Sequence, residues 1–174
     1  MYLRYFLQIH CIQSPLQNDD SRFTVFKQDG NKCPILHHGE LSAEIFCDFV
    51  TRCWNYVTNK EIAENKQMIK VMTALKGYIW EDWVSVHYDE LRTLPLTVFL
   101  QHFKDAFMPT KWETNVCVKL NALTQSESQT FCDYLTAVWN INSLLRGTES
   151  FLDDPKLRTH IEAGMDIGQV CLSS

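Results

Sequence analysis

The 174 residues of this chain suffice for one compact domain or two small ones, but not for a large enzyme. Apolar residues make up 45 % of the sequence and aromatic residues 12 %, which argues against disorder over most of its length. The formal net charge is −5, and none of the 16 Lys and Arg residues is adjacent to another. Because nucleic-acid binding needs clustered positive charge, we expect no direct nucleic-acid binding.

The first 36 residues predict a weakly constrained leader. Residues 22–27 alternate in a way that suits one short strand, and residues 28–31 carry a turn signal. The first twelve residues are too short and too polar for a signal peptide or a membrane span, so we expect a cytoplasmic protein without membrane contact. The 7 cysteines include no C-x-x-C pair, which favours reduced thiols in a cytosolic protein.

From residue 41 onward the apolar residues recur with the period of an α-helix. Ser42, Pro95 and Asp154 are expected at helix starts, and Thr110–Glu113 and Ser126–Gln129 have the pattern of capping boxes. Glycines 77, 147 and 164 are expected at helix ends. The chain therefore predicts seven helices, over about residues 41–57, 60–76, 78–91, 95–107, 111–123, 126–146 and 155–163.

These helices should bury a common set of large apolar side chains. The expected core contains Phe46, Phe49, Trp54, Ile69, Met72, Trp83, Leu100, Phe103, Leu120, Phe131, Leu135 and Leu145.

One stretch carries more information than any other. In residues 125–138, two polar residues four places apart, Gln125 and Gln129, precede an apolar helix. The positions that define the pattern are Gln125, Gln129, Phe131, Asp133, Tyr134 and Leu135. This pattern resembles the major homology region of retroviral and retrotransposon capsid proteins, although Gln129 replaces the Glu of the retroviral pattern and Ala137 replaces its Arg. A plain capping box on an amphipathic helix would also explain these local features.

Three flanking segments resemble the same family. The junction motif includes Pro109, Trp112 and Glu113, where Trp112 is expected to pin the fourth and fifth helices together. The other two segments contain Asn142, Leu145, Gly147 and Thr148, and then Leu157, Arg158, Glu162 and Gly164. In this order, from about residue 35 to 166, the segments resemble the Gag-like protein of gypsy-type LTR retrotransposons, especially those of basidiomycete fungi.

The resemblance implies an all-α, capsid-like helical bundle in which the polar residues of the homology region hydrogen-bond to one another. It implies a leader over 1–36, a five-helix N-terminal lobe over 37–123, a partial C-terminal lobe over 124–166 and a tail over 167–174. The implied function is structural: weak self-association, which in the intact family forms a shell around element RNA. The alternative is a truncated or domesticated Gag remnant that acts as a helical protein-interaction module.

No enzymatic function is expected. The sequence contains no phosphate-binding glycine loop, no nucleophile elbow and no zinc-protease or aspartic-protease motif. Cys132 and His160 could be combined as a catalytic Cys/His pair, but no motif supports this. His37 and His38 have no third metal ligand nearby in the sequence. We therefore assign no catalytic, cofactor-binding or metal-binding residue.

Overall fold

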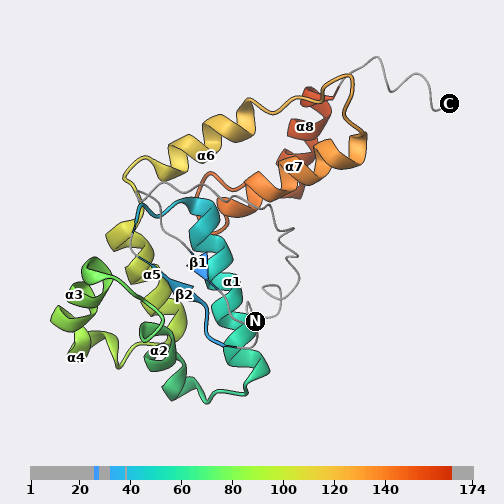
Figure 1. Cartoon of the computed structure of the whole chain (residues 1–174). Helices are drawn as coiled ribbons and strands as arrows, with labels where there is room; N and C mark the ends of the chain where they lie inside the picture. The colour runs from blue at the N-terminus through green and yellow to red at the C-terminus, as the bar shows by residue number, and fades with distance from the viewer. Residues whose placement is uncertain (1–25, 28–31, 38, 166–174) are drawn as a thin grey trace. The chain divides into compact units, whose positions relative to one another are not determined.

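The computed structural model describes residues 26–27, 32–37 and 39–165 (Figure 1). Within these ranges the chain is mostly helical, with eight helices and one pair of two-residue strands. The all-α class expected from the sequence is confirmed. The expected turn at 28–31 and the tail at 167–174 lie outside the described residues, as does most of the leader. None of the described helices is long and apolar enough to cross a membrane.

The chain divides into two compact units, between Pro109 and Thr110. In the first, strands β1 (Phe26–Lys27) and β2 (Ile35–Leu36) accompany helices α1 (Ala43–Asn59), α2 (Glu64–Met72), α3 (Tyr78–Val86), α4 (Tyr88–Leu91) and α5 (Leu96–Phe107). The second contains α6 (Trp112–Asn121), α7 (Phe131–Leu144) and α8 (Asp154–Gly164).

The position of α6 differs from the lobe boundary expected at residue 123. The helix packs against α7 rather than belonging to the first unit. Its first turn accepts a hydrogen bond from Ser150 through Glu113, and its last turn contacts His160 through the carbonyl oxygen of Leu120. The bonded residues are 37 and 40 positions apart in the sequence, and both partners of α6 belong to the C-terminal unit.

Helix α1 begins where the sequence places it. The Ser42 hydroxyl oxygen accepts a hydrogen bond from the Ile45 backbone N–H at 3.2 Å, which satisfies a donor that the first helical turn leaves open. Glu44 lies in the same turn, where the helix dipole favours an acid. The inward face of α1 is buried, as its apolar spacing predicts, through Ala43, Phe46, Phe49, Cys53 and Val57.

The end of α1 explains why the second helix starts later than residue 60. Glu61 has φ +49°, and its N–H donates to the Thr58 carbonyl oxygen. The Ile62 N–H donates to the Val57 carbonyl oxygen at 2.9 Å. These two bonds are those of a Schellman motif, in which the left-handed residue is usually Gly. The turn therefore occupies residues that helical periodicity alone assigned to α2.

Residues 73–77 are not helical, because backbone groups in this segment form hydrogen bonds with Leu36 instead of with a helical turn. Leu36 donates its N–H to the Ala74 carbonyl oxygen at 2.9 Å and accepts from the Lys76 N–H at 2.7 Å. Gly77 accordingly precedes α3 instead of ending the second helix. The expected helix over 78–91 is broken at His87, which separates α3 from α4.

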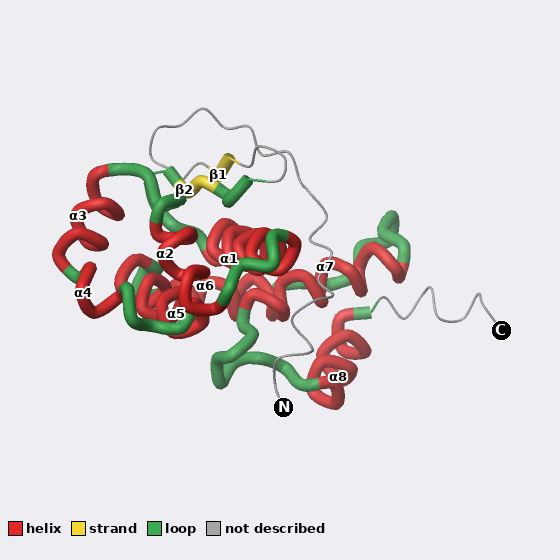
Figure 2. The backbone as a smooth tube through the Cα atoms, turned by 90° about the horizontal axis from the view of Figure 1, so that it is seen from below, coloured by secondary structure: helices red, strands yellow, loops and turns green. Residues whose placement is uncertain are grey.

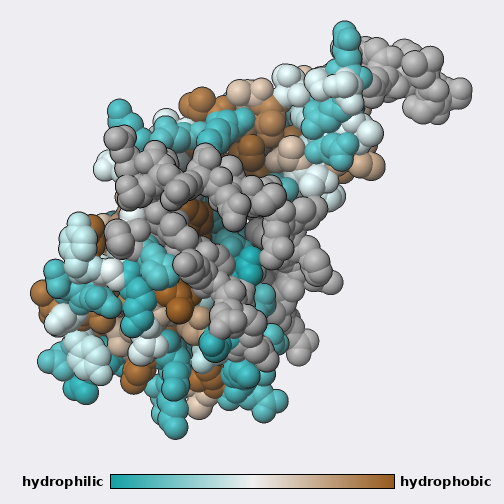
Figure 3. Space-filling view, in the orientation of Figure 1, coloured by the Kyte–Doolittle hydropathy of each residue, from teal (hydrophilic) through white to brown (hydrophobic). Residues whose placement is uncertain are grey.

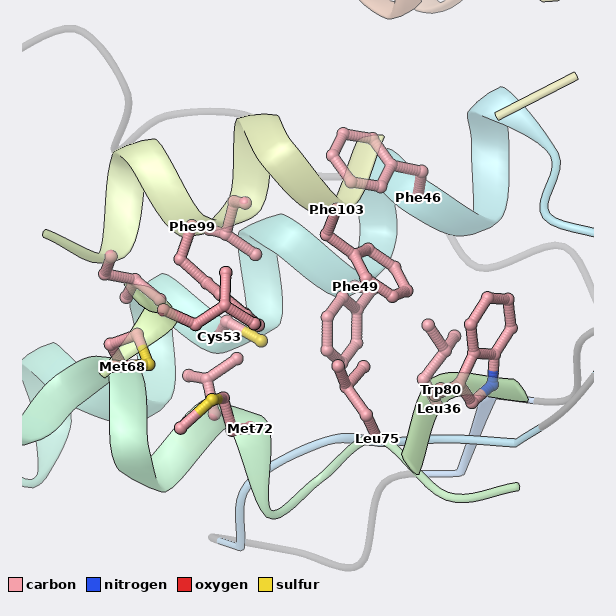
Figure 4. Close-up of a cluster of buried hydrophobic side chains, with 14 of the residues drawn as sticks. Leu36, Phe46, Phe49, Cys53, Met68, Met72, Leu75, Trp80, Phe99 and Phe103 are labelled. Atoms are coloured by element: carbon pink, nitrogen blue, oxygen red, sulfur yellow. The ribbon is translucent and has the colours of Figure 1, made fainter. Parts of the chain in front are cut away.

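The core of the first unit is a cluster in which aromatic rings meet sulfur-containing and aliphatic side chains (Figure 4). Phe103 is fully buried at its centre, with its ring centroid 5.2 Å from Trp80 and 6.5 Å from Phe49. Leu36 joins the same cluster from β2, and the strand pair lies beside α1 (Figure 2). Among the described residues, the Trp80 Nε1–H is buried without an acceptor, which typically costs about 1–3 kcal/mol.

Most of the expected core is buried, but two members are exposed and three are half-buried. Ile69 is 40 % exposed and Phe131 is 44 % exposed, because each lies on the outer edge of its helix. Trp54, Trp83 and Leu135 are half-buried. The remaining expected members are buried: Phe46, Phe49, Met72, Leu100, Phe103, Leu120 and Leu145.

The C-terminal unit has a smaller core of its own. Figure 1 shows α6 lying along α7, in agreement with the packing of these two helices. The buried side chains of this unit are Val116, Leu120, Gln125, Tyr134, Val138, Asn142, Leu145, Leu157 and Ile161.

The left-handed backbone at Glu61 gives a test of the α1 end. We expect Glu61→Gly to raise the free energy of unfolding by about 1 kcal/mol relative to Glu61→Ala, because a Cβ is disfavoured at positive φ. Both variants remove the carboxylate, so their difference isolates the backbone effect. Urea unfolding followed by circular dichroism measures it. A Gly variant less stable than the Ala variant would contradict the turn.

Candidate functional site

The homology-like segment forms a tight turn that is joined to the end of α8. Gln125 is buried, and its side-chain Nε2 donates to the Gln129 carbonyl oxygen at 3.0 Å. Its backbone N–H donates to the Gly164 carbonyl oxygen at 2.8 Å. The resemblance implied a hydrogen bond between polar side chains here. Gln125 and Gln129 are connected, but the acceptor is the backbone carbonyl oxygen of Gln129 and not its side chain.

Helix α7 starts at Thr130 and not at the predicted capping box of Ser126. The Thr130 hydroxyl oxygen accepts from the Asp133 N–H at 3.2 Å and donates to the Asp133 carboxylate at 2.6 Å. Ser126 instead accepts from the Gln129 N–H through its carbonyl oxygen, within the turn. Asp133 therefore has a capping role in the structure, which its place in the motif did not reveal.

Tyr134 connects α7 to α8 inside the unit. Its side chain is fully buried, and its hydroxyl donates to the Ile161 carbonyl oxygen at 3.4 Å. Burial raises the pKa of Tyr134, since the phenolate would lose its hydration there. The neutral phenol is the form that this site favours.

Gly164 is the residue that lets α8 approach α7 and the segment before it. A Cβ at this position would collide with the Tyr134 hydroxyl oxygen and would lie 3.0 Å from the Leu123 carbonyl oxygen. The sequence predicted that the last helix ends just before Gly164, and α8 ends at Gly164 itself, one residue later. Glycine is needed at this position because a side chain would not fit between α8 and Tyr134.

The segment around Asn142 closes the loop between α7 and α8. Asn142 is buried, and its side-chain amide donates to the Leu152 carbonyl oxygen at 2.9 Å and accepts from the Leu152 N–H at 3.0 Å. Gly147 has φ +83°, a left-handed conformation that favours glycine. Thr148 donates its hydroxyl hydrogen to the Leu145 carbonyl oxygen at 2.8 Å, and Leu145 is buried. The predicted positions of this motif are therefore structural.

The last motif lies on α8, with one buried and two exposed members besides Gly164. Leu157 is buried. The Arg158 guanidinium pairs with the Glu162 carboxylate at 2.9 Å, one helical turn away, in an exposed position. Asp153 caps this helix by accepting from the Lys156 N–H, where the sequence analysis placed the cap at Asp154.

The junction residues lie at the division between the units. Pro109 is the last residue of the first unit, and Trp112 is half-buried in the first turn of α6. The predicted capping box of Thr110 does not form, since Lys111 occupies the N-cap position without a side-chain bond. Glu113 accepts from the Ser150 hydroxyl instead. The expected pinning role of Trp112 stays a prediction.

A shallow groove between α7 and α8 is the surface that the sequence analysis did not identify. Phe131, Leu135 and Trp139 follow one another at four-residue intervals and form one of its walls. Trp139 is 55 % exposed, and Figure 3 shows apolar side chains at the surface over the C-terminal unit. The other lining residues are Asp154, Leu157, Arg158, Ile161, Glu162 and Met165.

The signal for this groove was present in the helical spacing. Helix α7 has two neighbouring apolar stripes, and only the one through Tyr134, Val138 and Leu145 is buried. Two residues of the other stripe, Phe131 and Leu135, were expected in the core. Helical periodicity alone does not distinguish a buried stripe from an exposed one.

The lining of the groove is mainly apolar, with three charged side chains. Among the described residues, no group of three or more His, Cys, Asp or Glu side chains could hold a metal ion. The Nε2 atom of His160 lies 3.1 Å from the Leu120 carbonyl oxygen. Cys132 is exposed.

Comparison with protein-family profiles, with curated proteins and with solved structures finds no match to this chain.

The contact at Gly164 can be tested with a double-mutant cycle. We expect Gly164→Ala to lower the free energy of unfolding by about 1–3 kcal/mol, because the added methyl group overpacks the site. The same change should cost less in a Tyr134→Phe background, which removes the nearest oxygen atom. Tyr134→Phe alone is the control, and urea unfolding is the measurement. Strictly additive effects would show that the two residues do not meet.

Proposed function

We propose that this chain is a Gag-like capsid module of the gypsy retrotransposon type, whose role is to associate with copies of itself. The observation that carries the proposal is that Gly164, from the last motif, meets both Gln125 and Tyr134 of the homology-like segment. These residues come from two of the four segments that resemble the family, and Gly164 follows Tyr134 by 30 residues and Gln125 by 39 in the sequence. A chance match of short motifs gives no reason for such contacts.

The groove between α7 and α8 supports self-association as the activity. Its apolar wall includes Phe131 and Trp139, and exposed aromatic side chains are enriched at the energetic centres of protein interfaces. The chain thus offers a surface whose burial by another molecule would be favourable.

The charges around the groove favour a second copy as the occupant. The lining contains one base, Arg158, and two acids, Asp154 and Glu162. In a two-fold contact each residue of one copy meets a residue of the other, so a surface that contains both signs can pair with itself. The ion pair of Arg158 with Glu162 is exposed and can exchange partners at little cost.

Self-association should depend on Trp139. We expect the chain to form reversible dimers or larger assemblies, and Trp139→Ser to weaken them by about 2 kcal/mol, or roughly thirtyfold in Kd, as is typical of a central aromatic residue. Sedimentation velocity across a concentration series measures this. Val86→Ser is the matched control, because Val86 is 79 % exposed on α3 in the other unit.

Two outcomes would contradict the proposal. A strict monomer at hundreds of micromolar, at high as well as low salt, would leave the alternative of a helical interaction module that takes a different partner. Equal effects of Trp139→Ser and Val86→Ser would show that assembly uses another surface. Negative-stain microscopy separates closed shells or rings from simple dimers.

The proposed role does not require this chain to hold RNA directly. Its basic residues are scattered through a sequence with net charge −5, so few phosphates could be neutralised together. We expect fluorescence anisotropy with single-stranded RNA to show no submicromolar affinity at physiological salt. A tight affinity that falls steeply with salt concentration would contradict this expectation.

A further inference from the structure

Helices α2 and α3 both lie in the first unit (Figure 1), and their outer faces carry opposite charge. On α2 and its cap, residues spaced by three, four and seven positions are exposed and share one side of the helix: Lys66, Ile69, Lys70 and Thr73. On α3 the same spacing gives a second exposed set: Tyr78, Glu81, Asp82 and Ser85. One face therefore presents two bases and the other presents two acids.

The charges of these two faces are not balanced inside the chain. None of the four charged side chains forms an ion pair with another described residue. Elsewhere in the unit such pairs do form, as between the Arg52 guanidinium and the Asp48 carboxylate, 2.9 Å apart on successive turns of α1. Helix α3 contains no base, and Glu64, the one acid of α2, lies two and four positions short of the spacing that would pair it with both lysines. Among the described residues, each face is thus left without its complement.

Apolar side chains lie within and beside the charged ones. Ile69 is 40 % exposed between the two lysines of α2, and at the start of α3 Tyr78 is 68 % exposed and Ile79 is 40 % exposed. Exposed ion pairs add little affinity but select the partner and its orientation, whereas burial of apolar surface supplies free energy. The two faces together contain both components of a specific contact.

A second copy of the chain carries the complement of both faces. When α2 of one copy lies against α3 of another, the bases of the first face the acids of the second, and the spacing of the two sets along their helices is the same. The apolar side chain of Ile69 is then covered by the side of α3 that bears Tyr78. No other partner has to be assumed to satisfy these charges.

We propose that the outer face of α2 binds the outer face of α3 on a second copy of this chain, as a contact separate from the groove between α7 and α8. This inference rests on the self-association proposed above and adds a second interface to it. A two-fold contact through the groove joins two copies and is then complete. A second contact allows each pair to bind further copies, which an extended assembly requires.

Exchanging the charges of the two faces tests this contact. All chains carry Trp139→Ser, which weakens the groove, and are compared with the Trp139→Ser chain itself. One variant adds Lys66→Glu and Lys70→Glu, and the other adds Glu81→Lys and Asp82→Lys. Each variant sets like charges against each other, so we expect sedimentation velocity at low salt to show association that is weaker by roughly tenfold or more.

Mixing the two variants should restore the contact. In a 1:1 mixture the reversed α2 meets the reversed α3, and the native α2 meets the native α3. We expect association to return to the level of the Trp139→Ser chain, and a chain with all four reversals to associate with itself. Both results require folded chains, so unfolding of a variant cannot produce them.

The control for net charge is Lys60→Glu with Lys111→Glu. It makes the same change in net charge as the α2 variant, at two exposed positions outside both faces, and should leave association nearly unchanged. Raising the salt concentration should weaken the contact between α2 and α3, because exposed charges are screened. The groove is mainly apolar and should respond less.

Three results would overturn the proposal. The first is a Trp139→Ser chain that is strictly monomeric at low salt and hundreds of micromolar, which would leave the two faces to other partners. The second is association that none of the four reversals changes. The third is a mixture of the two variants that associates as weakly as each variant alone. The groove is judged separately, by comparing the Trp139→Ser chain with the wild type, so either contact can fail without the other.

Discussion

At Gly164 the backbone of α8 lies against the Tyr134 ring, with no room for a side chain between them. The same residue accepts the Gln125 N–H through its carbonyl oxygen, so the turn before α7 and the end of α8 are fixed by one position. Buried backbone groups must be paired, and here the pairing occurs only if the two helices approach closely. The groove between α7 and α8 is lined by residues of the same two helices and by Met165, which directly follows Gly164.

Local signals in the sequence predict those parts of the fold that depend on neighbouring residues. The start of α1 is an example, since Ser42 caps a helix whose apolar face continues through Phe49 and Cys53. The division of the expected third helix at His87 and the non-helical segment at residues 73–77 could not be found in this way. The latter exists because Leu36, far away in sequence, takes the backbone hydrogen bonds of Ala74 and Lys76. Helical periodicity contains no information about such a partner.

The candidate site shows the same limit at the level of single residues. Gln125, Tyr134 and Gly164 were selected from two motifs, and the structure brings Gly164 to both of the others. Asp133 and Glu113 were selected too, but their partners, Thr130 and Ser150, depend on where the helices begin and on a loop 37 residues away. Phe131 was assigned to the core because its spacing fits a buried stripe. Whether a stripe is covered depends on which other elements reach it, and spacing does not encode that.

The division between Pro109 and Thr110 has a consequence for the evolution of such a chain by recombination. Every member of the large hydrophobic cluster lies between residues 33 and 108, so that core is complete without any residue of the C-terminal unit. A recombination event that joins new sequence at this point would transfer an intact core together with its surface, instead of splitting one. The chain is in this sense built from two exchangeable parts, and the unit that bears the aromatic groove can be replaced while the core around Phe103 is inherited whole.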